Sequence, residues 1–170
     1  GLAQAAQDVR EAGDDLGQAL NLLKALGWYC IAVVTGLLLH VLIVYSSLFK
    51  IFSKMKLKDF FAAIQPAVLL GFSTSSSVAT LPVTMERVEK NLGVEEEVAS
   101  FVLPVGATIN MDGTSLYQAV AAVFIAQALG MDLSIAQQLT IVLTATLASI
   151  GAAGVPGAGI IMLVIVLQAI

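Results

Sequence analysis

Charged residues and cysteine are scarce in this sequence of 170 residues, and each scarcity excludes a class of protein. Only 12% of the residues are charged, the net charge is −4, and no basic patch indicates a nucleic-acid partner. The single cysteine, Cys30, excludes an intrachain disulfide framework and a cysteine-rich metal site. Hydrophobic residues make up 58% of the chain, and the mean hydropathy is +0.93. No soluble domain of this size needs so much apolar sequence, so we predict an all-α, multi-pass membrane protein surrounded by lipid.

The first uncharged run predicts a spanning helix. Residues 1–24 have mixed charge and predict the end of a preceding helix and an extracellular loop, with the loop at Gly13-Asp14-Asp15. Residues 25–50 predict a transmembrane helix, because the 25 residues from Ala25 to Phe49 carry no charge. Four lysines follow in a short loop and place the cytoplasm at that end. These are Lys50, Lys54, Lys56 and Lys58.

Several polar side chains with aromatic rings lie in this first span. Trp28 and Tyr29 near its start and Tyr45 near its end are typical of interfacial anchors. His40 lies well inside the span. Either a buried structural histidine or a proton relay would account for its position.

Residues 59–90 predict an inner re-entrant hairpin. Its uncharged part, Phe60 to Met85, is long enough for a span, but five consecutive hydroxyl residues, Ser73 to Ser77, lie at its centre, and Pro82 follows. Each arm is too short to cross a bilayer alone, so we expect the chain to enter from the cytoplasm, turn at the serines and return. A plain kinked helix is the alternative.

Residues 98–130 predict a transmembrane helix broken at an Asn-Met-Asp motif. Asp112 is the only charge between Phe101 and Met131, and Gly106 and Gly113 weaken the helix on both sides of Asn110. A carboxylate at membrane depth must be protonated, paired or bound to a cation, and no Lys or Arg is near in the sequence. Hard cations prefer carboxylate, amide and backbone oxygens, so we predict a cation or substrate site. A structural hydrogen-bonding role for the acid is the alternative.

Residues 133–170 predict an outer re-entrant hairpin. The stretch has no charge, and its centre, Ser149 to Gly159, holds four glycines and a proline in eleven residues, which excludes a regular helix. A serine precedes a proline by seven residues in both hairpins, at Ser75 and Ser149. This layout predicts an inverted repeat, incomplete because the chain stops in uncharged sequence, and we expect it to be part of a longer protein.

Three motifs together resemble the dicarboxylate/amino acid:cation symporter family, the sodium-coupled glutamate and aspartate transporters. They are Ser75 to Pro82, Asn110 to Thr114, and Ser149 to Pro156, and the resemblance covers roughly Leu16 to Ile170. It implies an elevator-type transport domain from a homotrimer of the plasma or inner membrane, and not an enzyme. The implied activity is symport of glutamate, aspartate or a dicarboxylate with sodium ions.

The resemblance also implies which residues bind. Those for the small anionic substrate are Ser75, Ser76, Ser77, Thr114, Val155, Pro156, Gly157 and Gly159. Those for sodium ions are Gly106, Thr108, Asn110, Met111, Asp112, Ser149, Ile150 and Ala152. In the family, a final helix that this chain lacks selects the substrate. Val78 and Ser75 depart from residues common in relatives, a serine and an arginine respectively.

Several alternatives stay open at this point. Proton-coupled transport of a dicarboxylate and sodium-coupled transport of a neutral amino acid both fit the same motifs. An ion channel could also use two re-entrant loops. An intramembrane enzyme would need a nucleophile with a base, and at membrane depth only His40 could serve as that base. A purely structural subunit would not need a glycine-flanked Asn-Met-Asp break.

Overall fold

The computed structural model describes residues 2–152 and 154–169, with side chains from Gly17 onward. Throughout this part of the chain the regular structure is helical, and no strand occurs, which confirms the all-α prediction. Three residues of the predicted segments lie outside the described residues. They are Gly1, Ala153 of the glycine-rich stretch, and Ile170 at the end of the predicted outer hairpin.

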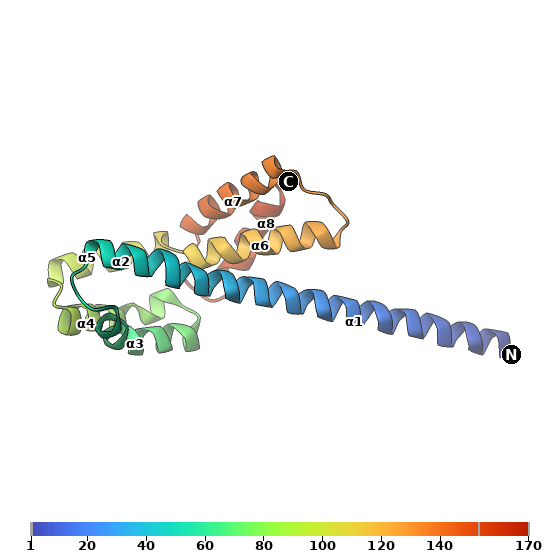
Figure 1. Ribbon diagram of the computed structural model, residues 1–170, viewed down its shortest axis with the longest axis horizontal. Coiled ribbons are helices and arrows are strands. Elements are labelled where there is room, and N and C mark those ends of the chain that lie inside the picture. Colours follow the sequence, from blue (N-terminus) through green and yellow to red (C-terminus); the bar gives the residue numbers. More distant parts are fainter. Residues whose placement is uncertain (1, 153, 170) are drawn as a thin grey trace.

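One long continuous helical segment begins the chain and extends well beyond the rest of the molecule (Figure 1). It consists of α1 (Leu2–Leu39), the π-helical turn η1 (His40–Tyr45) and α2 (Ser46–Phe52). The backbone is helical through Gly13, Asp14 and Asp15, so the predicted loop there is wrong. A single glycine costs only about 1 kcal/mol in a helix, and a long helix can absorb that cost.

Two antiparallel helices follow, and they pack side by side (Figure 1). Helix α3 (Leu57–Thr74) and helix α4 (Ser77–Leu92) are joined only by Ser75 and Ser76. Helix α4 ends at Gly93, whose positive φ of 71° is a conformation that favours glycine. Helix α5 (Glu96–Ile109) then packs against α4.

The last three helices form a small bundle with α1. Helix α6 (Asp112–Ala128) contacts α1, α7 (Ile135–Ile150) and α8 (Ala158–Leu167). Helix α7 begins with a capping box, in which Ser134 and Gln137 satisfy each other's backbone N–H groups. The buried core of this bundle is apolar and small. It consists of Ala122, Ile141, Ala145 and Val166.

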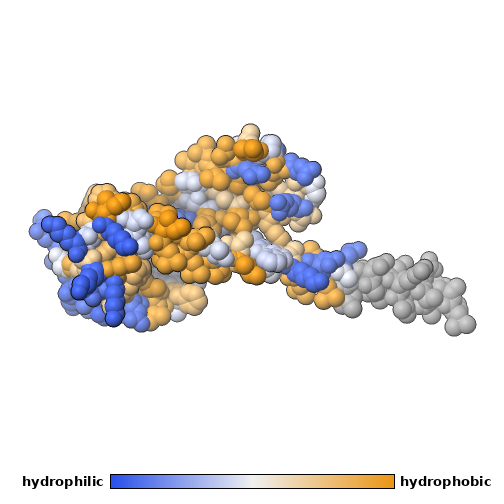
Figure 2. Space-filling view, viewed as in Figure 1, coloured by the Kyte–Doolittle hydropathy of each residue, from blue (hydrophilic) through white to orange (hydrophobic). Residues whose placement is uncertain are grey.

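The surface is largely apolar, and hydrophilic side chains gather at the end of the molecule where α2, α3, α4 and α5 meet (Figure 2). Gly17–Phe52 has 36 residues, contains an 18-residue stretch with a mean hydropathy of 2.2, and is long and apolar enough to cross a membrane. Two shorter helices, Ile135–Ile150 and Ala158–Leu167, are also apolar. Large apolar side chains such as Phe72, 88% exposed, indicate contact with lipid or further protein.

Candidate functional site

Three interruptions of the helices meet at one cavity of about 430 Å³. The first separates α3 from α4, the second separates α5 from α6, and the third is the loop between α7 and α8. All three contribute to the cavity wall, together with η1. The lining residues are Tyr45, Ser75, Ser77, Asn110, Met111, Asp112, Gly113, Thr114, Tyr117, Ala152, Gly154, Val155, Gly157, Gly159 and Ile160.

The first interruption contains a strained residue. Ser75 has φ 50° and ψ 30°, and among the described residues it is the only one other than glycine with a positive φ. This left-handed conformation costs about 1–2 kcal/mol for an L-residue, and such strain is concentrated at functional sites. The next residue, Ser76, caps α4, because its hydroxyl accepts a hydrogen bond from the Ala79 N–H at 3.2 Å. The turn is therefore held in a single tight shape.

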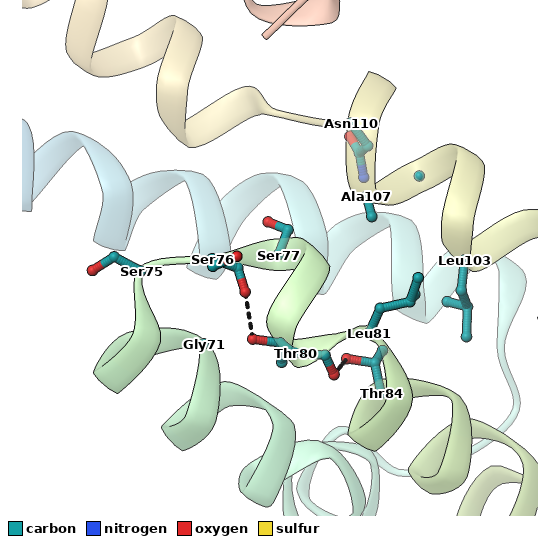
Figure 3. Close-up of a pocket in the computed structure, with 11 residues that line it drawn as sticks. Gly71, Ser75, Ser76, Ser77, Thr80, Leu81, Thr84, Leu103, Ala107 and Asn110 are labelled. Carbon is teal, nitrogen blue, oxygen red and sulfur yellow. Dashed lines mark hydrogen bonds between the residues drawn. The ribbon is translucent and has the colours of Figure 1, made fainter. Parts of the chain in front are cut away.

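The same turn borders a second cavity, of about 460 Å³, on its other side. Figure 3 shows this cavity, with the Ser75–Ser77 turn near Ala107 of α5 and near Asn110, which follows the end of α5. Ser75, Ser77 and Asn110 line both cavities, so they form the wall between them. Thr80 donates its hydroxyl hydrogen to the Ser76 carbonyl at 2.7 Å.

The second interruption contributes Asp112, the only acidic side chain among the described residues that line the cavity. Asn110 and Met111 are non-helical, and Asp112 is the first residue of α6. His40 donates from Nε2 to Asp112 Oδ2 at 3.0 Å, and the Tyr45 hydroxyl donates to the same oxygen at 2.7 Å. Asp112 therefore has two side-chain donors, although the sequence around it offers no Lys or Arg as a partner. Tyr45, predicted as an interfacial anchor, is one of these donors.

The third interruption contacts the first directly. The carbonyl oxygen of Gly154 accepts hydrogen bonds from Ser76 Oγ at 2.8 Å and from the Val78 N–H at 3.2 Å. A Cβ at Gly154 would lie 2.9 Å from Val78 Cγ2 and 3.1 Å from the Ala107 carbonyl oxygen. Only glycine permits this close approach. The turn between α3 and α4 and the loop between α7 and α8 are thereby fastened together over the cavity.

The cavity brings together ten of the sixteen residues predicted to bind. Ser76 and Gly106 line the second cavity instead. Ser149 and Ile150 line a neighbouring cavity that shares Met111 and Asp112 with the first. Thr108 and Pro156 line none of these cavities. The ten that line the first cavity are Ser75, Ser77, Asn110, Met111, Asp112, Thr114, Ala152, Val155, Gly157 and Gly159.

Several residues at the site were missed from the sequence, and one of them had a usable signal. Tyr117 follows Thr114 by three residues, so both lie on one face of α6, and the helical period could have revealed it. Tyr45 and His40 had no such signal, because residues five apart in an α-helix diverge by about 140°. Gly113, Gly154 and Ile160 were the other lining residues that were missed.

Replacing Ser76 with alanine is expected to destabilise the protein by about 1–2 kcal/mol. The variant loses a helix cap and leaves the Gly154 carbonyl without its shorter hydrogen bond, and Ser76 is 8% exposed. Thermal unfolding of the purified protein in detergent measures the change. Ser73→Ala is the control, since its exposed hydroxyl bonds only the Leu70 carbonyl of its own helix. Equal melting temperatures for the two variants would contradict this role of Ser76.

Helix ends that converge on a polar cavity, in a chain with an apolar surface, are typical of secondary transporters. Comparison with known proteins gives the particular family. The model of the sodium:dicarboxylate symporter family matches residues 15–170, and the chain belongs to this family. The prediction that the chain is not an enzyme agrees with a family and relatives that are transporters.

The chain is similar to several excitatory amino acid transporters. It is 52% identical to excitatory amino acid transporter 3 of Mus musculus over 150 residues, which are 88% of this chain and 29% of that protein. It is 50% identical to an excitatory amino acid transporter of Caenorhabditis elegans over 147 residues, 86% of this chain and 29% of the relative. The chain is 48% identical to excitatory amino acid transporter 1 of Rattus norvegicus over 145 residues, which are 85% of this chain and 27% of that protein. The chain thus spans less than a third of the length of these relatives.

Proposed function

We propose that the protein containing this chain transports a small anionic substrate, an acidic amino acid or a dicarboxylate, together with sodium ions. The observation that carries the proposal is the single cavity to which all three helix interruptions contribute. The family description and the names of the relatives support the same substrate class. The substrate sites predicted from the sequence, Ser75 with Ser77 and Val155 with Gly157 and Gly159, would bind it from two sides.

Helix orientation favours an anion in this cavity. Helices α4, α6 and α8 all begin at its wall, at Ser77, Asp112 and Ala158, whose preceding residue Gly157 lines it. The N-terminus of a helix carries a partial positive charge and free N–H groups, which stabilise an anion nearby. At the start of α6 the carboxylate of Asp112 already occupies this field. The starts of α4 and α8 are therefore the places where carboxylate groups of a substrate would bind.

Charge explains why cations would accompany the substrate. Asp112 supplies a negative charge, and the described lining residues include no Lys or Arg to offset it. A second anion in the same cavity is disfavoured unless positive charge arrives with it. Asn110 and Asp112 offer amide and carboxylate oxygens, and the non-helical backbone offers carbonyl oxygens, which are the ligands that hard cations prefer. Sodium and substrate would therefore raise each other's affinity, as linkage requires.

In the proposed mechanism the loop between α7 and α8 closes on the α3–α4 turn once substrate and cations are bound. The α3–α4 and α7–α8 pairs are the two re-entrant hairpins of this proposal. Together with the broken α5–α6 segment they then move as one transport domain across the plasma or inner membrane. A scaffold in a homotrimer would remain fixed while this elevator motion occurs. The α3–α4 turn and the α7–α8 loop are the tips of the two hairpins. The hydrogen bonds from Ser76 and Val78 to Gly154 support a closed arrangement of these two tips.

Uptake into vesicles tests the proposal. The full-length protein, reconstituted into liposomes, should accumulate labelled aspartate, glutamate or succinate when an inward sodium gradient is present. Replacing external sodium with choline should abolish accumulation. Uptake driven by a pH gradient in choline would favour proton-coupled dicarboxylate transport, uptake of alanine or serine alone would favour a neutral substrate, and steady current without substrate would indicate a channel.

A further inference from the structure

The π-helical turn η1 has a consequence for the cation site. A π-turn is rare, and it is frequently found at functional sites. In an α-helix His40 and Tyr45 would point in directions about 140° apart. The wider winding of η1 instead brings the two rings together, with centroids 4.7 Å apart in an edge-on arrangement. Both side chains then reach one carboxylate on another helix.

The turn is stabilised within its own helix. The backbone N–H of Ser46 donates to the carbonyl of Val41, five residues earlier, as a π-turn requires. The hydroxyl of Ser46 donates to the same carbonyl at 3.1 Å. Ser46 is buried, at 8% exposure. These two hydrogen bonds support the π-turn that brings His40 and Tyr45 to the same side of the helix.

Both hydrogen bonds fall on the same oxygen of Asp112. His40 Nε2 lies 3.0 Å and Tyr45 Oη 2.7 Å from Oδ2, and within the described residues no side chain donates to Oδ1. A carboxylate oxygen accepts in two lone-pair directions, so two donors fill Oδ2. The carboxylate is thus held in one rotation, and one of its oxygens remains able to bind a cation. Tyr45 also lines the cavity itself.

We infer that His40 and Tyr45 are positioning residues for the cation site, because they occupy Oδ2 of Asp112 and reserve Oδ1 for the alkali cation. The inference rests on the proposed function, since it assumes that Asp112 binds a coupled cation. A carboxylate already fixed by its neighbours loses little freedom when the ion binds, so the ion binds more tightly. Tyr45 acts through Asp112 and is not itself assigned as a ligand.

Tyr45→Phe tests this role with the smallest possible change. In the full-length protein in liposomes, we expect the sodium concentration for half-maximal aspartate uptake to rise about five- to tenfold, because a hydrogen bond to a charged group is lost. The maximal rate at saturating sodium should stay within about twofold. A residue that only supports folding would instead lower the amount of active protein and leave the half-saturating sodium concentration unchanged.

Tyr29→Phe is the matched control. Tyr29 lies on α1, packs on Phe124 with ring centroids 5.3 Å apart, and its hydroxyl bonds no other described residue. The sodium dependence of uptake by the Tyr29→Phe variant should match that of the unaltered protein. For Tyr45→Phe, an unchanged half-saturating concentration would overturn the inference, and so would a lowered one, which would show that Tyr45 competes with the cation. If the unaltered protein shows no sodium dependence, the proposed function itself fails.

Discussion

Replacing Asp112 with asparagine is expected to raise the sodium concentration for half-maximal substrate binding by about a hundredfold or more. The variant keeps the shape of the side chain and an oxygen that can accept from His40 and Tyr45, but it removes the charge. A pair of unit charges about 4 Å apart gains about 4 kcal/mol at an effective dielectric constant of 20. Most of that attraction is lost when the carboxylate becomes an amide. The half-saturating sodium concentration for substrate binding measures the loss.

The control for this experiment is Asp132→Asn, which also removes one negative charge. Asp132 is exposed in the connection between α6 and α7 and lies outside the cavity. The half-saturating sodium concentration of the Asp132→Asn variant should equal that of the unaltered protein. An Asp112→Asn variant that folds and retains the sodium dependence of the unaltered protein would remove Asp112 from the proposed cation site.

Replacing Gly154 with alanine is expected to lower substrate affinity at least tenfold. The added Cβ would meet Val78 Cγ2 at 2.9 Å and the backbone oxygen of Ala107 at 3.1 Å, and a backbone atom cannot move away cheaply. The loop between α7 and α8 must then shift outward, and both hydrogen bonds to the Gly154 carbonyl lengthen. Hydrogen bonds weaken steeply as their geometry departs from the optimum. Equilibrium binding of labelled aspartate at saturating sodium measures the effect.

Gly151→Ala provides a matched control in the same loop. A Cβ at Gly151 would meet only the Ala148 carbonyl oxygen, at 3.9 Å, which is ordinary van der Waals contact. Its φ of −91° also suits alanine. Both variants therefore add one methyl group to the same loop, and they differ in whether the surrounding atoms leave room for it. If both bind aspartate equally well, contact between the two tips does not control affinity.

The helix interruptions were visible in the sequence because their causes are local. The serine run ends α3 at Thr74, and α5 ends at Ile109, just before the Asn-Met pair. Hydroxyl side chains compete for backbone hydrogen bonds, and glycine weakens a helix, so both effects act within a few residues. The family resemblance rested on the same local motifs.

The partners of Asp112 could not be predicted, because they depend on the path of a different helix. His40 precedes Asp112 by 72 residues, and only the packing of the first long helix against α6 brings the two together. Tyr45 depends in addition on a π-turn, for which the residues His40 to Tyr45 give no local signal. The continuous helix through Gly13 was missed for the opposite reason. There the local signal was present, and the rest of the helix outweighed it.

The fastening of the two tips at Gly154 is weak enough to break spontaneously. Two hydrogen bonds, each worth about 0.5–1.5 kcal/mol net, set an opening cost of about 1–3 kcal/mol. At that cost the tips would be apart for roughly 1–15% of the time, with exchange on the microsecond to millisecond scale. The cavity would then exchange its contents with the surrounding water by thermal fluctuation, without any external source of energy.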